Sequence, residues 1–339
     1  MQRTLDFGSI SSTVTMLDRH SLFEGLNAEL YCIADTNTEK YAPRDFPLIA
    51  LPAGEASKSW DQLHHILDAL LAAGLSRSGT VVGIGGGAVT DVAACAGSLF
   101  LRGCRVVLVP TSLLAMVDAA IGGKTGINFG GFKNMVGTFY PAHEVRICTG
   151  LLETLSDREY KSGLAEVIKS ALLGDRGLLE TLETRRDDVL SREPSIVDEV
   201  VWACVNVKGD VVEQDLRESG VRAHLNLGHT FGHALESVAG LGAYSHGEAV
   251  AWGMAQAMEL GLRIGVTEPD YARRVRDLLE AYGYRIDPLP ELAREIRLAM
   301  NMDKKRMRHE VRFILQRAVE DTLVTAVDET TLEAALSGR

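Results

Sequence analysis

Long hydrophobic runs, cysteine pairs and positive charge are all scarce in this 339-residue chain. No apolar stretch could span a bilayer, and Met1 to His20 lack the apolar core of a signal peptide, so we expect a cytoplasmic protein with no membrane partner. The five cysteines are scattered and never form CxxC, which argues against a disulfide framework and against a thiolate zinc site. A net charge of -11 argues against nucleic acid as a partner.

The length and a composition of 46% hydrophobic residues suit a globular protein with two domains. Over residues 1–150, β-rich runs such as ELYCIAD, GTVVGIGGG and CRVVLVPTS alternate with helical stretches such as SWDQLHHILDALLAAG and VTDVAACAGSLFL. This alternation predicts parallel strands with crossover helices. Residues 151–339 have mainly helical periods, and β signals return only in VRFILQR and TLVTAVD. We therefore predict an α/β domain over 1–150 and a mainly helical domain over 151–339.

The stretch TVVGIGGGAVTDVAACAG combines an apolar β-run, a glycine cluster and a helical pattern. Gly83, Gly85 and Ala88 fit the GxGxxG/A pattern, in which a diphosphate sits on a helix N-terminus. A plain glycine turn would look the same, and the acid expected about 20 residues downstream to hold a ribose is missing. Upstream, Asp35 ends a predicted strand and GEASK offers Glu55 and Lys58, so a nucleotide could be held from that side.

A second glycine-rich stretch, VDAAIGGKTGINFGGFKNMVG, contains the letters GKT of a nucleotide phosphate loop. That motif also needs a glycine at its first position, where this chain has Asp118, so the phosphate-loop interpretation fails. What remains is a glycine-rich loop in which Lys124, Lys133 and Asn134 can meet a phosphate or a carboxylate. The alternative is a solvated surface loop. We favour a binding loop because the segment is apolar enough to be partly buried.

Three helical patterns carry unexpected polar side chains. LNLGHTFGHALE places His229 and His233 one turn apart on one face, which suits metal ligands and hydrogen-bonded core residues alike. No glutamate base lies between them as in HExxH, which counts against hydrolysis. Glu166 and Lys169 in GLAEVIKSALL can be a simple ion pair. Lys208 occupies the apolar stripe of VVWACVNVKGDVV, so it must snorkel or face a polar pocket.

Beyond these patterns, a further histidine, His246, stands at the start of the helical stretch GEAVAWGM, directly before its first letter. One carboxylate with two or three imidazoles makes a plausible zinc set, because three protein ligands leave a fourth position open for a substrate oxygen.

In this order, GGGAVTD, LRGCRVVLVPTSLLAMVDAAIGGKTGIN, KNMVGTFY, GLAEVIK, ESGVRAHLNLGHTFGHALE and HGEAV resemble the 3-dehydroquinate synthase family of the shikimate pathway. The resemblance implies a Rossmann-like parallel-sheet domain that binds NAD over 1–150 and a helical domain that binds metal and substrate over 151–339, in a homodimer. The chain departs from the family pattern at FGGFKN, where Gly130 and Phe132 stand in place of the usual proline and glycine.

The resemblance also implies roles for individual residues. A divalent metal, zinc or cobalt or another, would be bound by Glu166, His229 and His246. The adenosine of NAD would be contacted by Asp35, Glu55 and Lys58. The remaining cofactor contacts would be Gly86, Gly87, Asp91, Thr111 and Lys133. The substrate would be surrounded by Asp118, Lys124, Asn134, Lys169, Lys208, Arg222, Asn226, His233 and either Lys304 or Lys305, of which we favour Lys305. Arg102 would reach the phosphate site of the neighbouring subunit.

The implied reaction is a lyase step of aromatic amino acid biosynthesis. It converts 3-deoxy-D-arabino-heptulosonate 7-phosphate, a sugar phosphate, into 3-dehydroquinate and phosphate. NAD takes a hydride from a metal-polarised alcohol and returns it after phosphate has left, so NAD is catalytic. We interpret His233 as the residue that relays protons.

Three other functions compete with this one. A related sugar phosphate cyclase on the same scaffold tends to change the basic substrate residues, which are intact here. A metal- and NAD-dependent polyol dehydrogenase would not need Lys124, Lys208 and Arg222 together as an anion clamp. A nucleotide-binding module without enzymatic activity would leave the histidine cluster and Lys208 without a purpose.

Overall fold

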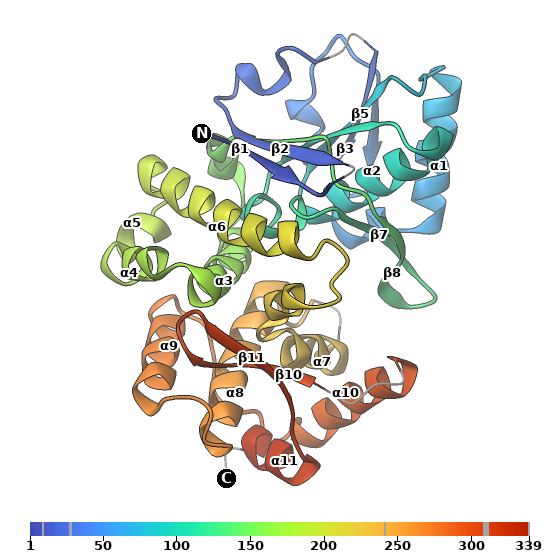
Figure 1. Ribbon diagram of the computed structural model, residues 1–339. Helices are drawn as coiled ribbons and strands as arrows, with labels where there is room; N and C mark the ends of the chain where they lie inside the picture. Colours follow the sequence, from blue (N-terminus) through green and yellow to red (C-terminus); the bar gives the residue numbers. More distant parts are fainter. Residues whose placement is uncertain (9, 27–28, 241, 308–311, 338–339) are drawn as a thin grey trace. The chain divides into compact units, whose positions relative to one another are not determined.

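The computed structural model describes residues 1–8, 10–26, 29–240, 242–307 and 312–337, except for the side chains of 301–307. Two compact units make up the chain (Figure 1). Unit 1 contains Met1–Tyr160 and Val197–Arg217, and unit 2 contains Lys161–Ile196 and Glu218–Arg339. Most of helix α6 (Pro194–Gln214) thus belongs to unit 1, although the sequence patterns place it in the helical half.

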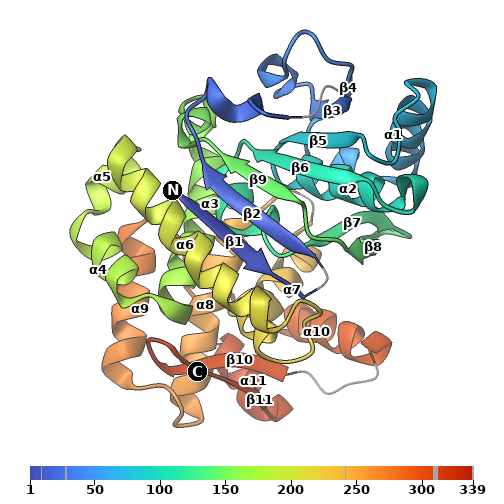
Figure 2. The same ribbon diagram turned by 45° about the horizontal axis from the view of Figure 1, so that its top comes forward.

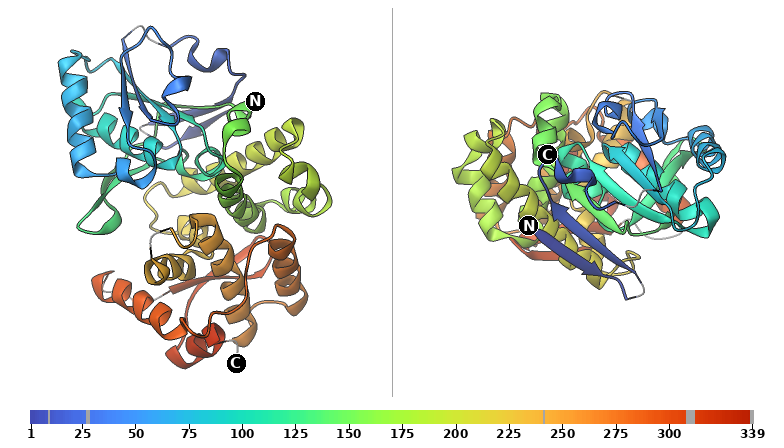
Figure 3. Two further views of the ribbon diagram at one scale, coloured as in Figure 1. Left: turned by 180° about the vertical axis from the view of Figure 1, so that it is seen from behind. Right: turned by 90° about the horizontal axis from the view of Figure 1, so that it is seen from above.

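Unit 1 is built on a seven-stranded sheet with the strand order β1-β2-β9-β6-β5-β3-β4 (Figure 2). Its strands are β1 (Gln2–Asp6), β2 (Ser11–Met16), β3 (Leu30–Asp35), β4 (Leu48–Leu51), β5 (Thr80–Gly85), β6 (Arg105–Pro110) and β9 (Glu144–Ile147). β1 and β2 pair antiparallel and form one edge (Figure 3), whereas all other neighbours are parallel. Helices α1 (Trp60–Ala72) and α2 (Gly87–Leu99) are two of the crossovers that parallel pairing needs. The predicted α/β architecture is confirmed.

Helix α2 lies very close to the sheet because strand β5 carries glycines beneath it. A Cβ atom added at Gly83 would lie 2.7 Å from Cβ of Ala93, and one added at Gly85 would lie 2.5 Å from Cβ of Val89. Every residue of β5 is buried. The tight contact fixes the N-terminus of α2 at the carboxyl ends of β5 and β6, where parallel α/β sheets bind their ligands.

The glycine-rich segment predicted as a loop is instead an antiparallel hairpin of β7 (Lys124–Phe129) and β8 (Phe132–Phe139). Gly126 and Gly137 are paired, and a Cβ atom at Gly137 would lie 1.9 Å from the carbonyl oxygen of Thr125. The glycines therefore allow two strands to approach closely, which a loop would not require. The middle of β7 is buried and the strand packs on α2, but β8 is largely exposed. The expectation of partial burial holds only for the first strand.

Unit 2 is mainly helical, as predicted. Its helices are α3 (Asp157–Gly174, whose first turn belongs to unit 1), α4 (Arg176–Thr184), α5 (Arg186–Leu190), α7 (His229–Ala239), α8 (His246–Arg263), α9 (Pro269–Ala281), α10 (Ala293–Met307) and α11 (Glu329–Ser337). The two predicted C-terminal strands form an antiparallel pair, β10 (Arg312–Ala318) and β11 (Asp321–Ala326). Helix α8 is buried on nearly all sides and packs on α7, α9, α11 and β10. In the described chain, no helix is both long and apolar enough to cross a membrane.

Candidate active site

Glu166, His229 and His246 come together in unit 2 from three helices, α3, α7 and α8. Nε2 of His229 lies 3.7 Å from Oε1 of Glu166, and Nε2 of His246 lies 3.6 Å from the same oxygen. In a tetrahedral site with bonds of about 2.0–2.1 Å, donor atoms lie about 3.4 Å apart. The three donors therefore surround a space of the right size for one ion. A carboxylate with two imidazoles suits zinc or cobalt and leaves a fourth position open.

Glycines next to both histidines bring the three helices together. Gly247 follows His246, and its backbone N–H donates to Oγ of Ser162 on α3 at 2.9 Å. A Cβ atom at Gly247 would lie 2.1 Å from the carbonyl oxygen of Ser162. Gly228 precedes His229 with a φ of +79°, and a Cβ atom there would lie 2.7 Å from the carbonyl oxygen of Val250 on α8. Only glycine fits these approaches, so the ligand geometry depends on backbone packing.

The two histidines have opposite pKa shifts in the metal-free protein. Burial is the largest influence on His229, and with the charge of Lys169 it lowers the pKa to about 3. Burial also opposes a charge on His246, but Glu166 and Glu236 together outweigh it and raise the pKa of His246 to about 9. Near neutral pH, therefore, His229 is neutral and His246 is protonated, and an incoming cation must displace the proton of His246.

Other predicted residues of unit 2 lie near this cluster in the chain or in space. Lys169 is buried and forms an ion pair with Glu166. Arg222, in the 3-10 helix η7 (Val221–Asn226), is only 2% exposed. Asn226 donates to Oε1 of Glu218 at 2.7 Å. The ring of His233 is exposed and its centre lies 5.2 Å from that of His229. Lys304 and Lys305 belong to α10, and their side chains lie outside the described part of the chain.

Predicted diphosphate contacts lie at the start of α2 in unit 1. Gly86 is the N-cap residue of this helix and Gly87 is its first residue. A Cβ atom at Gly86 would lie 3.3 Å from Oγ of Ser112, and one at Gly87 would lie 3.3 Å from Cβ of Ala119. Thr111 follows β6, and its N–H donates to the carbonyl oxygen of Gly85 at 2.9 Å. A bare helix N-terminus at the ends of two parallel strands suits a diphosphate group.

Asp35 ends β3 at the same edge of the sheet and is 7% exposed. Its Oδ1 accepts hydrogen bonds from the N–H groups of Asn37 at 2.9 Å and Thr38 at 3.0 Å, and from the hydroxyl of Thr38 at 2.9 Å. The carboxylate thus already organises the turn after β3. The structure gives Asp35 a local role in the fold, whatever it contacts besides.

A polar network in unit 1 connects three predicted nucleotide contacts with Asn134. Nζ of Lys58 lies 2.5 Å from Oδ2 of Asp91 and also donates to Oδ1 of Asn134. Burial raises the pKa of Asp91, and the charge of Lys58 partly offsets this effect. The network continues through Asn128, whose side-chain NH2 donates to Oε2 of Glu55 at 2.8 Å and whose Oδ1 accepts from the N–H of Asn134 at 2.9 Å.

The lysine predicted to interrupt an apolar stripe has a carboxylate partner. Lys208 is 7% exposed, forms an ion pair with Asp118 and donates to the carbonyl oxygen of Asp118 at 2.7 Å. Asp118 lies in a π-helical turn, η5 (Ala115–Ala119), and such turns are frequent at functional sites. Lys124 and Lys133 are exposed. Arg102 is also exposed and has a φ of +64°, next to Leu101 with a φ of +49°.

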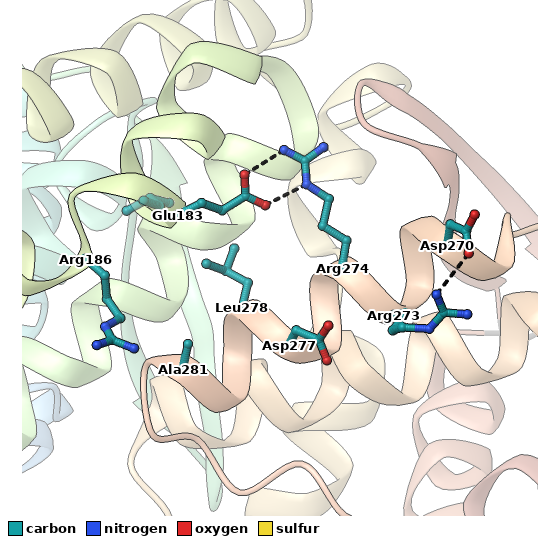
Figure 4. Close-up of a pocket in the computed structure, with 9 residues that line it drawn as sticks. Glu183, Arg186, Asp270, Arg273, Arg274, Asp277, Leu278 and Ala281 are labelled. Carbon is teal, nitrogen blue, oxygen red and sulfur yellow. Dashed lines mark hydrogen bonds and ion pairs between the residues drawn. The ribbon is translucent and has the colours of Figure 1, made fainter.

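A cavity of about 420 Å³ opens elsewhere in unit 2, beside helices α4 and α9 (Figure 4). Its charges are balanced by internal pairs, since Arg274 donates to both oxygens of Glu183 and Arg273 pairs with Asp270. None of the residues predicted to bind metal, NAD or substrate lines it. We do not assign it to the reaction.

Two residues that the sequence patterns did not single out take part in these networks. Asn128 bridges Glu55 and Asn134 from strand β7, and nothing in GKTGIN distinguishes it from an asparagine that only forms a turn. Glu236 has Oε2 3.6 Å from Nδ1 of His246. Its position seven residues after His229 places both on one helical face, so that signal was present in the sequence.

Comparisons with known proteins cover most of the chain. One family model, described as 3-dehydroquinate synthase N-terminal, matches residues 48–162, and another, 3-dehydroquinate synthase C-terminal, matches residues 163–306. The 3-dehydroquinate synthase of Acidithiobacillus ferrooxidans is 43% identical over 303 residues, which is 88% of this chain and 82% of that protein.

Two solved structures resemble the fold over the whole chain. A 2-epi-5-epi-valiolone synthase from Streptomyces hygroscopicus, with NAD+ and Zn2+ bound, has a TM-score of 0.87 at 28% identity and covers 98% of both chains. A 2-deoxy-scyllo-inosose synthase, complexed with carbaglucose-6-phosphate, NAD+ and Co2+, has a TM-score of 0.88 and covers 100% of this chain and 99% of that one. At 23% identity the second likeness concerns the fold alone.

Proposed function

The chain belongs to the 3-dehydroquinate synthase family of lyases, and on this premise we propose that it converts 3-deoxy-D-arabino-heptulosonate 7-phosphate into 3-dehydroquinate and phosphate. Catalytic NAD and one divalent metal ion take part. The observation that carries the proposal is the cluster of Glu166, His229 and His246, whose donor atoms lie within 4.8 Å of one another in a chain matched by both halves of the family.

In this function Glu166, His229 and His246 hold the metal, and the start of α2 with Thr111 receives the diphosphate of NAD. Glu55 and Lys58 contact the adenosine side, together with Asp35; Gly86, Gly87, Asp91 and Lys133 complete the cofactor contacts. When bound, the metal polarises the reacting alcohol and NAD accepts and later returns its hydride. The burial of Glu166 supports a metal role, because a buried carboxylate needs cations around it.

The substrate carries a phosphate and a carboxylate, and the cations bind these groups. We assign Lys124, Lys169, Lys208 and Arg222 to this purpose. Asp118 contacts the ammonium group of Lys208 through its carboxylate and its carbonyl oxygen, so this group is positioned before substrate arrives. His233 is exposed and can exchange protons with water; Asn134, Asn226 and Lys305 complete the proposed substrate contacts.

The test is phosphate release by metal-loaded protein with a trace of NAD. We expect rapid release from 3-deoxy-D-arabino-heptulosonate 7-phosphate and very slow release from glucose 6-phosphate, which has no carboxylate to bind the cations. Comparable rates with both, or a preference for glucose 6-phosphate, would point to a related cyclase and overturn the proposed substrate. His246→Ala serves as the control for metal-independent hydrolysis.

The proposal includes a homodimer. The β7–β8 hairpin exposes Phe129, Phe132, Met135 and Phe139, with exposed fractions of 39–55%. Large exposed apolar side chains on one hairpin favour its burial against a second copy of the chain. The expected result in light scattering is a dimer for the native chain and a monomer for Phe132→Glu with Met135→Glu.

Arg102 then supplies a cation to the neighbouring subunit. Mixing two inactive variants, Arg102→Ala and His246→Ala, tests this, because each mixed dimer contains one site with both residues intact. About a quarter of the native activity should return after random exchange of subunits. No recovery, with mixed dimers verified by mass, would show that Arg102 acts within its own chain.

A cytoplasmic location and zinc as the native metal complete the proposal. None of the five cysteines, all in described parts of the chain, forms a disulfide, and all are buried, which suits a reducing compartment. The donor set of one carboxylate and two imidazoles suits zinc, although cobalt binds such sites as well. Metal analysis of protein purified without added metal identifies the native ion.

A further inference from the structure

Helix α7 presents a third polar side chain on the face that carries His229 and His233. Glu236 lies three residues after His233 and seven after His229, so all three project from one side of the helix. Its Oε2 is 3.6 Å from Nδ1 of His246, and its side chain is only 15% exposed. A partly buried carboxylate beside one ring nitrogen of a histidine influences which of the two ring nitrogens carries the proton.

The two ring nitrogens of His246 face different carboxylates. Nε2 faces Glu166 at 3.6 Å, and Nδ1 faces Glu236. A neutral imidazole carries one N–H, and the nitrogen that binds a metal must be the other one. An acceptor beside Nδ1 keeps the proton there and leaves Nε2 as the donor. His229 has the same arrangement with a different acceptor, because its Nδ1 lies 3.3 Å from the carbonyl oxygen of Leu227.

We propose that Glu236 is a positioning residue for the metal centre: it accepts the Nδ1–H of His246, which selects the tautomer and fixes the ring so that Nε2 points at the ion. This inference rests on the proposed metal site. Helix α7 then provides both a metal ligand, His229, and the residue that positions the second histidine ligand, His246.

The same atoms could hold a second cation instead. In the described chain His233, Glu236 and His246 also offer donor atoms within 4.8 Å of one another. With one ion already on Nε2, however, a second ion on Nδ1 would need an imidazole that has lost both N–H protons. It would also place two divalent cations on opposite sides of one ring, where they repel each other. A hydrogen bond from Nδ1 to Glu236 requires no loss of the second N–H proton and brings no second cation near the first.

The test is titration of metal-free protein with Co2+, followed by its visible absorption and by competition with a chelator. Glu236→Ala should weaken Co2+ binding by about 10- to 100-fold, the usual effect of losing such an outer acceptor. Glu236→Gln keeps an oxygen that can accept from Nδ1 and should lose less. The matched control is Glu259→Ala, on the same helix as His246 but thirteen residues further on, about 20 Å along its axis.

Unchanged Co2+ affinity and an unchanged spectrum in both Glu236 variants, with native circular dichroism, would overturn the proposal. So would a native chain that binds two Co2+ ions and a Glu236→Ala variant that binds one with undiminished affinity, because Glu236 would then be a ligand. A native chain that binds no Co2+ would refute the proposed metal site itself, which distinguishes the two failures.

A second positioning residue lies in unit 1 and depends on different contacts. Asn128 of β7 makes three hydrogen bonds to two separate segments. Its backbone N–H donates to the carbonyl oxygen of Lys58 at 2.8 Å, its side-chain NH2 donates to Oε2 of Glu55 at 2.8 Å, and its Oδ1 accepts from the N–H of Asn134 at 2.9 Å. Asn134 has a φ of +53°, an uncommon conformation that this bond helps to hold.

We infer that Asn128 aligns Glu55 for NAD and at the same time holds Asn134, a proposed substrate contact; the inference rests on the proposed cofactor site. A side-chain amide donates through its NH2 group and accepts through its oxygen, so one uncharged side chain can bond to the carboxylate and to the backbone N–H at once. Loss of both bonds in Asn128→Ala should raise the dissociation constant for NAD by about tenfold or more.

The control is Thr125→Val in the same strand, which removes a hydroxyl that bonds across the hairpin to Thr138 but does not contact the network. Calorimetry should show weakened NAD binding in Asn128→Ala and near-native binding in Thr125→Val at a similar melting temperature. Equal affinity in Asn128→Ala and the native chain would overturn the inference. Equal weakening in both variants would do so too, since the hairpin rather than Asn128 would be responsible. A native chain that binds no NAD would refute the cofactor site instead.

Discussion

Replacing Gly247 with alanine should disrupt the metal site without altering any ligand. The new Cβ would lie 2.1 Å from the carbonyl oxygen of Ser162, whereas an ordinary contact needs 3.4 Å. One of the two helices must therefore shift by about 1.3 Å, the difference between these distances. Glu166 lies one turn after Ser162 on α3, and His246 immediately precedes Gly247, so the shift separates two ligands directly. The expected costs are about 1–3 kcal/mol of stability and about 100-fold in metal affinity.

The assay is chelator competition for zinc beside thermal unfolding of the metal-free protein. Gly177→Ala is the matched control, because its new Cβ would meet only the tip of the Asp175 side chain at 3.3 Å and alanine is favoured within helix α4. We expect Gly177→Ala to bind zinc as the native chain does. Native zinc affinity in Gly247→Ala would refute the argument that packing of α8 on α3 sets the ligand geometry.

Other predictions concern pH and charge. The pKa of His246 is about 9 and that of His229 is about 3, so zinc uptake near neutral pH should release about one proton per ion. Calorimetry in two buffers with different heats of ionisation measures this number. A value near zero would contradict these pKa values. In the metal-free protein the stabilisation from protonated His246 is complete below about pH 6.5 and is lost as the pH rises towards 9, which melting curves across that range should show. Lys208→Met should lower kcat/KM by about 100-fold or more and also lower the melting temperature, because it strips Asp118 of its ion pair. Adding Asp118→Asn should restore the melting temperature but not kcat/KM, and recovery of both would make the pair purely structural.

The sequence was most informative about features that depend on a single helix, strand or connection. The β5 to α2 connection follows from an apolar run, a glycine cluster and a helical period, all local signals. Lys208 was recognised because it interrupts an apolar stripe, and Asp118 is the polar partner that a lysine at this position requires. Among the cations of the proposed anion clamp, Lys208 is therefore already paired with a carboxylate before any substrate binds.

Contacts between distant segments could not be read from periodicity. Glu166 and His246 are eighty residues apart, and although residue chemistry suggested a zinc set, only the resemblance to a family assigned these two residues to it before the fold was known. The β7–β8 hairpin was missed because its strands owe their pairing to glycines, which usually indicate loops. Asn128 was missed because its role is defined by its contacts with Glu55 and Asn134 and has no sequence pattern of its own. Glu236 shares a helical face with His229, but its contact with His246 depends on the packing of α7 on α8.

The central claim is that the enzyme oxidises its substrate only transiently, and phosphate release measured together with NADH absorbance tests this most directly. With NAD far below the concentration of 3-deoxy-D-arabino-heptulosonate 7-phosphate, we predict many phosphate ions released per molecule of NAD and no steady rise in NADH. A rise in NADH that matches product formation, with turnover stopping when NAD is exhausted, would contradict the account and identify a dehydrogenase instead.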